Sequence, residues 1–293
     1  MYDVLVIGAD GMVGGVVFNY LRDCCNVLGT SRDVSSSHYK YVANRDIKSL
    51  QLLLSKLSPG ALVINCVAIL DLGGKDVLDK NLLLESIEIN SIFPHFLANE
   101  CAAMGMRLIH ISTDAVFGSN SGFFSEDMSL SPNSVYGMTK ALGEISIENA
   151  ITIRCSLIGP CYGAKKGGLW HWISNAEKNA TLQGYENHFW TGVTTLQFAR
   201  ICHALLNKAS FFELTKHGSV HHLCVNDVIT KYDLIFLVAQ NIRPDLKIVK
   251  TESKIASNRQ LISKSNQLNK LLDKVKWDEA IEELGLLQLK LES

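Results

Sequence analysis

The sequence predicts an α/β fold with a doubly wound parallel sheet. Short β-branched strands alternate with longer helical stretches, and the strands are apolar along nearly their whole length. Strands of this kind are buried on both faces, with helices covering each side of the sheet. The expected strands lie at 3–7, 26–30, 39–43, 61–67, 107–112 and 151–155. The expected helices lie at 12–23, 47–57, 83–104 and 136–149, with a kink or break at Pro94.

Composition narrows the functional classes. The chain has 293 residues, is 47% hydrophobic and carries a formal net charge of −1. This charge offers no broad basic field for nucleic acid or for an anionic membrane, and we expect neither as a partner. Eight cysteines occur without a Cys-x-x-Cys pair, which indicates reduced thiols, a cytoplasmic location and no metal site. The first residues lack a basic flank, so we interpret them as a strand rather than a signal peptide.

Three glycines follow the first expected strand with the spacing G-x-x-G-x-x-G. Glycines at such a turn allow a dinucleotide pyrophosphate to approach the backbone and the N-terminus of the next helix. The spacing alone is weak evidence, but its place in the first strand–helix unit predicts a Rossmann fold. The expected cofactor-binding residues of this loop are Gly8, Gly11, Met12, Val13 and Gly14.

The end of the second expected strand bears on the choice of cofactor. An acidic residue there accepts hydrogen bonds from a ribose 2′-hydroxyl, whereas an arginine accommodates a 2′-phosphate. Ser31 and Arg32 therefore favour NADP(H). Asp33, about twenty residues past the glycines, keeps NAD open as the alternative.

Tyr136 and Lys140 form a Tyr-x-x-x-Lys motif at the start of an expected helix. Residues four apart share one helix face, and an ammonium near a phenol lowers the phenol pKa. We therefore expect Tyr136 to act as a general acid that protonates the alkoxide formed when hydride reaches a carbonyl carbon. The pair occurs often by chance, but here Ser112 and Thr113 end a strand at the sheet edge where such folds bind ligands.

In combination, these motifs resemble the extended short-chain dehydrogenases/reductases, and within them the dTDP-4-dehydrorhamnose reductase-like group. The resemblance covers roughly residues 1–240. It rests on the glycine loop, Ser112-Thr113-Asp114-x-Val116-Phe117, Tyr136-Gly137-x-Thr139-Lys140 and Arg154-Cys155-Ser156.

The resemblance implies roles for individual residues. Thr113 would hydrogen-bond the substrate carbonyl, Tyr136 would donate the proton, and Lys140 would tune Tyr136 and hold the nicotinamide ribose. Asn90 would support the active site, or it is simply a helix-side asparagine. Further cofactor contacts are implied for Asp46 and Ile47 at the adenine and for Cys66, Val67 and Ala68 along the dinucleotide.

One departure from the pattern separates related activities. Sugar-nucleotide dehydratases of this superfamily carry Thr-Asp-Glu at the strand end, whereas here the third residue is Ala115. The missing carboxylate argues for keto reduction rather than water elimination. The Tyr–Lys pair argues against a non-catalytic NADP-binding regulatory subunit, which remains an alternative, as does a sugar-nucleotide epimerase/reductase.

The second half is expected to form a smaller C-terminal substrate lobe. We assign 1–156 and about 187–215 to the cofactor-binding core, and about 157–186 and 216–293 to the lobe. The aromatic segment 184–195 either contacts a nucleotide sugar or seals the two parts together. Lys165 and Lys166 either meet a substrate diphosphate or lie in a solvated loop, and Trp277 is expected to pack.

The sequence thus predicts an NADPH-dependent reductase of the 4-keto group of a nucleotide-linked 6-deoxyhexulose, in deoxysugar or surface-polysaccharide biosynthesis. The expected partner is a nucleotide sugar, whose base (dTDP, UDP or GDP) stays open. A homodimer is one option for its assembly.

Overall fold

The computed structural model describes residues 1–70, 80–118, 122–162 and 167–292. Within these residues, the centre is a parallel sheet of seven strands in the order β11-β6-β5-β4-β1-β2-β3. The winding reverses at β1, because β2 and β4 lie on opposite sides of it, which confirms the doubly wound fold. The strands are β1 (Tyr2–Ile7), β2 (Val27–Ser31), β3 (Tyr39–Lys40), β4 (Leu57–Asn65), β5 (Arg107–Ser112), β6 (Ala150–Arg154) and β11 (Val220–His222).

Helices cover both faces of this sheet, as the apolar strands predict. In β1, Val4 and Val6 belong to the core cluster beneath α1 (Met12–Leu21) and α7 (Thr195–Ala204). Leu5 and Ile7 point to the opposite face, into a cluster that includes residues of α2 (Ile47–Leu54) and α4 (Phe93–Ala103). Alternate side chains of one strand thus fill two separate cores. α8 (Lys208–Thr215) follows α7 along the chain.

The predicted helix over 83–104 is broken, as Pro94 indicates. It consists of α3 (Lys80–Ser86), the π-helical segment η1 (Ile87–Ile92) and α4, with Pro94 in the first turn of α4. Proline lacks a backbone N–H and is tolerated at such a position. The wide turn of η1 packs against α5 (Val135–Leu142), which carries the Tyr-x-x-x-Lys motif.

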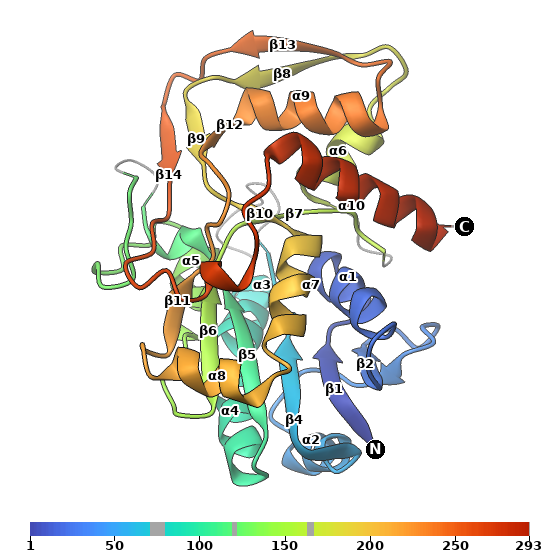
Figure 1. The fold of residues 1–293 in the computed structure, drawn as a ribbon, viewed down its shortest axis with the longest axis vertical. Helices are drawn as coiled ribbons and strands as arrows, with labels where there is room; N and C mark the ends of the chain where they lie inside the picture. The colour runs from blue at the N-terminus through green and yellow to red at the C-terminus, as the bar shows by residue number, and fades with distance from the viewer. Residues whose placement is uncertain (71–79, 119–121, 163–166, 293) are drawn as a thin grey trace.

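The lobe lies over the carboxyl ends of the central strands (Figure 1). Its parallel pair β8–β13 joins segments from both halves of the predicted lobe, and its three-stranded sheet has the order β12-β9-β14. Its elements are β7 (Leu157–Ile158), α6 (Gly168–Ser174), β8 (Thr181–Tyr185), β9 (His188–Trp190), β10 (Val193–Thr194), β12 (Ile229–Thr230), α9 (Lys231–Ile242), β13 (Lys247–Thr251), β14 (Ser257–Arg259), η3 (Asn269–Leu271) and α10 (Trp277–Glu292). Among the described residues, no helix is both long and apolar enough to cross a membrane.

Two segments belong to a different part of the structure, core or lobe, from the one expected. β11, within the expected lobe, pairs with β6 and forms the edge of the central sheet. β9, within the expected core, pairs with β12 and β14 of the lobe. Strand pairing over such distances depends on the tertiary arrangement and not on local composition.

Arg107 at the start of β5 links the C-terminal end of α7 to the central sheet. Its guanidinium donates to the carbonyls of Gly60, Leu205 and Leu206 at 3.1, 2.8 and 3.1 Å, and it lies over the Phe211 ring. The side chain is buried, and two of its acceptors follow the C-terminus of α7, where a cation is favoured.

We predict that Arg107→Met lowers the free energy of unfolding by about 2–4 kcal/mol, because buried carbonyls lose a charged donor. Urea denaturation followed by circular dichroism measures this change. The control is Arg22→Met at an exposed arginine, which should change stability by about 0.5 kcal/mol or less. Equal effects of the two substitutions would contradict the role given to Arg107.

Candidate active site

The glycine loop lies at the carboxyl end of β1, where the winding of the sheet reverses. Gly8 has φ +87°, a conformation that favours glycine. A Cβ on Gly14 would lie 2.1 Å from the Gly8 carbonyl oxygen, so glycine is required for α1 to begin this close to the strand. Gly11 caps α1 without a side chain, which leaves the helix N-terminus open to an anion. The loop therefore fits a dinucleotide pyrophosphate.

The end of β2 presents an arginine and not a free carboxylate. Asp33 turns back on its own loop, where its carboxylate accepts hydrogen bonds from the backbone and hydroxyl of Ser35 at 2.9 and 2.8 Å. These bonds lower the Asp33 pKa. Arg32 is exposed and 3.5 Å from Glu85, while the Ser31 hydroxyl accepts from the Asp33 N–H. This arrangement suits a 2′-phosphate better than a bare ribose.

The end of β4 runs beside the glycine loop. A Cβ on Gly8 would lie 2.7 Å from a methyl group of Val67, so the two turns are in close contact. Burial raises the pKa of the Cys66 thiol to about 12, which makes it a packing group and not a nucleophile. Cys66, Val67 and Ala68 thus border the surface that the glycine loop presents. Their contact with a cofactor stays a prediction.

Asp46 has a structural task that accounts for its position. It is the N-cap of α2, and its carboxylate accepts from the backbone of Lys48 and Ser49 at 3.1 and 3.3 Å. Ile47, the next residue, is exposed. The adenine contact implied for both residues stays a prediction.

Thr113 and Tyr136 meet at the carboxyl end of β5. The Thr113 hydroxyl donates to Asp114 Oδ1 at 3.1 Å and accepts from the Ala115 N–H at 3.2 Å. Burial raises the pKa of the Tyr136 phenol, and a hydrogen bond with Thr113 acts in the opposite direction. Tyr136 is therefore protonated at neutral pH. The expectation that Lys140 lowers this pKa is wrong here, because the Lys140 amine is bound elsewhere.

Lys140 is almost fully buried and is held by β5. Its Nζ donates to the Ile111 carbonyl and lies 3.2 Å from Nε2 of His110. Burial lowers its pKa to about 8, and the Glu144 carboxylate opposes this shift. The amine therefore gains or loses its charge close to the physiological pH range.

Asn90, in the wide turn of η1, connects two parts of the site. Its Oδ1 accepts from the Ile69 N–H at 2.8 Å, and its Nδ2 donates to the Ile69 carbonyl and the Thr139 hydroxyl at 2.9 and 3.1 Å. It thus links the segment after β4 to the residue before Lys140. These contacts account for its complete burial and agree with a supporting role, which stays a prediction.

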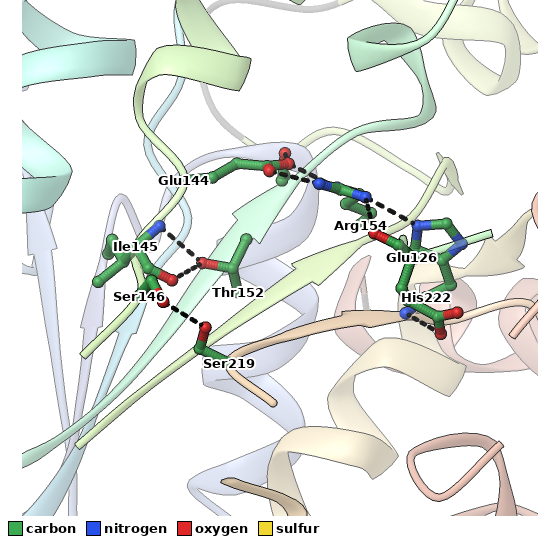
Figure 2. Close-up of polar contacts among 9 residues, drawn as sticks. Glu126, Glu144, Ile145, Ser146, Thr152, Arg154, Ser219 and His222 are labelled. Carbon is green, nitrogen blue, oxygen red and sulfur yellow. Dashed lines mark hydrogen bonds and ion pairs between the residues drawn. The ribbon is translucent and has the colours of Figure 1, made fainter. Parts of the chain in front are cut away.

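A buried ion pair lies behind the site. Arg154 on β6 binds both carboxylate oxygens of Glu144 at 2.7 Å, and the Ser112 hydroxyl donates to the same carboxylate at 2.7 Å. Figure 2 shows the Arg154 guanidinium between Glu144 on one side and Glu126 and His222 on the other. Arg154 donates to the Glu126 carbonyl and lies 3.3 Å from Nε2 of His222.

The same network reaches the lobe. The Glu126 carboxylate accepts from the Ser263 hydroxyl and the Lys264 N–H at 2.6 and 3.0 Å, and Nδ1 of His222 donates to the Ile262 carbonyl at 2.9 Å. Ser112, held by Glu144, lies between Ile111, which binds Lys140, and Thr113. The network therefore fixes both the carboxyl end of β5 and the lobe above it.

Four supporting residues of the site carry no motif that points to this role: Asn65, His110, Glu144 and His222. A usable signal is a polar residue inside a run that otherwise predicts a fully buried strand, as His110 is in Leu108–Ser112. Glu144 is four residues beyond Lys140, but α5 ends at Leu142, so helical spacing does not place it.

The aromatic segment of the lobe is mainly a packing element. Trp190 stacks on Trp277 with ring centroids 5.4 Å apart, and the Trp277 indole donates to the Asp227 carbonyl at 2.8 Å. Phe189 remains about 39% exposed and available to a ligand. Lys165 and Lys166 lie outside the described residues.

Fold and site together define a dinucleotide-binding protein of the extended short-chain dehydrogenase/reductase type. The chain belongs to the RmlD substrate binding domain family, which it matches over residues 2–283.

Solved structures share the whole fold at low identity. A dTDP-4-dehydrorhamnose reductase from Clostridium acetobutylicum superposes with a TM-score of 0.70 and 20% identity, over 97% of this chain and 99% of that one. The Bacillus anthracis enzyme of the same name, in complex with NADP, gives 0.71 and 16%, over 98% and 100%. UDP-glucuronic acid 4-epimerase from Bacillus cereus gives 0.70 and 20%, over 98% and 99%. The fold therefore does not distinguish these reactions.

Similar curated proteins include two kinds by name. Methionine adenosyltransferase 2 subunit beta from Xenopus tropicalis is 25% identical over 80% of this chain and 70% of its own length. A probable low-salt glycan biosynthesis reductase, Agl14 from Haloferax volcanii, is 30% identical over 55% of this chain and 54% of its own. The spore coat polysaccharide biosynthesis protein SpsK from Bacillus subtilis is 30% identical over 54% of each.

We predict that Glu144→Gln lowers the free energy of unfolding by about 3–5 kcal/mol, because it leaves the buried Arg154 without a counter-charge. The matched control is Glu283→Gln, whose ion pair with Arg200 is partly exposed and should be worth about 0–1 kcal/mol. Thermal and urea denaturation compare the two. Similar losses in both variants would show that the Glu144–Arg154 pair has no special role.

Proposed function

We propose that this protein is an NADPH-dependent reductase of the 4-keto group of a nucleotide-linked 6-deoxyhexulose. The observation that carries the proposal is the meeting of Thr113 and Tyr136 at the end of β5, with Lys140 on the same helix face as Tyr136 and the glycine loop at the same edge of the sheet. These groups can surround one carbonyl oxygen next to a bound dinucleotide.

The roles of the residues follow from their protonation. NADPH, when bound, supplies the hydride that reaches C4. The phenol of Tyr136 carries its proton at neutral pH, so it can give that proton to the carbonyl oxygen as the C–H bond forms. The Thr113 hydroxyl hydrogen-bonds the same oxygen and orients it. The Lys140 amine would hold the nicotinamide ribose, and the glycine loop with Arg32 would hold the phosphates.

The substrate class is supported by the family and by the names of several relatives. Agl14 and SpsK are named for glycan and polysaccharide biosynthesis, and the solved neighbours include dTDP-4-dehydrorhamnose reductases. Ala115 lies at the position where dehydratases carry an acid, which favours simple reduction. Each of the eight cysteines is a free thiol, which suits the reducing cytoplasm as the place of this reaction.

A second candidate function is a cofactor-binding regulatory subunit. It is favoured by the methionine adenosyltransferase 2 beta subunits, which match 80% of this chain. On this alternative, the protein binds NADPH but reduces no ketone. An epimerase/reductase is the third alternative. Its product would be inverted at a second carbon, whereas the product of a simple reductase would not. Mass spectrometry and NMR of the product distinguish the two.

We predict that the protein binds NADPH more tightly than NADH and that Arg32→Ala removes most of this preference. The loss should be about 1.5–3 kcal/mol, the value of a charge-assisted contact to the 2′-phosphate. Fluorescence titration with both cofactors measures it. Asp33→Asn is the matched neighbour control and should leave the preference in place, since the Asp33 carboxylate is engaged by Ser35. Equal affinities in the unchanged protein would refute the assignment of NADPH.

We predict that Tyr136→Phe slows reduction by about 10²–10⁴-fold with little change in stability or NADPH affinity, because it removes the proton donor and keeps the ring. The assay follows NADPH at 340 nm with a 4-keto-6-deoxy nucleotide sugar. The control is Tyr41→Phe, which removes a buried phenol on the other face of the sheet. A Tyr136→Phe protein with the normal rate would end the proposed mechanism. NADPH binding without reduction in the unchanged protein would favour the regulatory subunit.

A further inference from the structure

His110 is a buried histidine that touches the catalytic lysine. It lies in the middle of β5, opposite Asn65 on β4, and is completely enclosed. Its Nδ1 is 3.1 Å from Nδ2 of Asn65, and its Nε2 is 3.2 Å from Nζ of Lys140. The three side chains form one continuous hydrogen-bonded row from β4 through β5 to α5.

The orientation of the Asn65 amide determines the proton position on His110. Asn65 Oδ1 accepts from the Val67 N–H at 3.3 Å, so its Nδ2 faces the imidazole and donates to Nδ1. A neutral imidazole that accepts at Nδ1 carries its proton on Nε2. This N–H points at the Lys140 amine.

The row has one donor too many when Lys140 is charged. An ammonium has three donors and no acceptor, whereas a neutral amine can accept the His110 N–H and still donate to the Ile111 carbonyl. A doubly protonated His110 is worse, because its Nδ1 proton would face the Asn65 amide. The hydrogen bonds therefore favour the neutral amine and the neutral imidazole.

The charges around the row agree with this count. Lys140 faces the Glu144 carboxylate and the Cys66 and Cys155 thiols, and Glu144 is already bound by Arg154 and Ser112. His110 faces Lys140 and, from α4, His95. Burial, helped by Lys140 and His95, holds the His110 pKa well below its ordinary value, and burial lowers the Lys140 pKa to about 8.

We propose that Asn65 and His110 form a positioning pair for Lys140, which holds its amine at the end of β5 through one row of hydrogen bonds. The catalytic meaning of this pair rests on the proposed function. Since Lys140 is charged below about pH 8 and neutral above it, NADPH affinity and turnover should both fall as the pH rises through this value.

His110→Gln tests the pair. The glutamine amide can offer its oxygen to Lys140, which favours the ammonium, so the Lys140 pKa should rise by about one unit or more. The pKa is read from the ¹³Cε shift of labelled lysine, with the Lys140 signal assigned by its loss in Lys140→Met. The alkaline limit of NADPH binding, and of kcat, should move upward by the same amount.

A second variant changes Asn65, at the other end of the hydrogen-bonded row from Lys140. Asn65→Asp replaces the amide donor with an acceptor, so His110 should carry its proton on Nδ1 and accept from the ammonium at Nε2. The Lys140 pKa should again rise. The control is His95→Gln, whose ring contacts the Leu142 carbonyl and not the row, and it should leave the Lys140 pKa in place.

An unchanged Lys140 pKa in folded His110→Gln and Asn65→Asp proteins overturns the positioning pair, and so does a shift of equal size in His95→Gln. The lysine titration needs neither cofactor nor substrate. A shifted pKa in a protein that reduces no ketone would therefore sustain the pair while refuting the proposed reductase activity.

Discussion

The buried ion pair between Glu144 and Arg154 is the interaction on which the rest of the site depends. A carboxylate and a guanidinium so deeply enclosed are tolerable only with every hydrogen bond in place, and here each bond comes from a different part of the chain. Through Ser112 the pair fixes the end of β5, and through His222 and Glu126 it fixes the lobe. Loss of one member would therefore loosen both the end of β5 and the lobe.

The same edge of the sheet controls the protonation of the Tyr136 phenol and the Lys140 amine by burial. Tyr136 keeps its proton because its phenol is buried beside Thr113. Lys140 is ready to lose its proton because β5 encloses it. An acid that is protonated and an amine that titrates near neutral pH can coexist four residues apart, since each contacts a different part of the strand end. The helical spacing of Tyr136 and Lys140 therefore does not by itself predict their pKa values.

The fold is shared by proteins of different chemistry. Reductases and an epimerase superpose on this chain equally well, and the methionine adenosyltransferase 2 beta subunits match 80% of it. What separates such proteins is a small number of side chains above the same sheet. In this chain they include Ala115 in place of an acid. They also include Arg32, whose neighbour Asp33 has its carboxylate engaged by Ser35. They favour reduction with NADPH more strongly than the overall architecture does.

Local sequence determined the features that depend on one element or one turn. The apolar strands predicted a sheet covered on both faces, Pro94 predicted a helix break, and the glycine spacing predicted the loop after β1, because each depends on near neighbours in the chain. The tertiary structure alone decided which groups Lys140 contacts. Its partner His110 is 30 residues away, and Asn65 is another 45 from His110. Periodicity does not specify which side chains of packed strands and helices will meet, and their burial reversed the expected pKa shift of Tyr136.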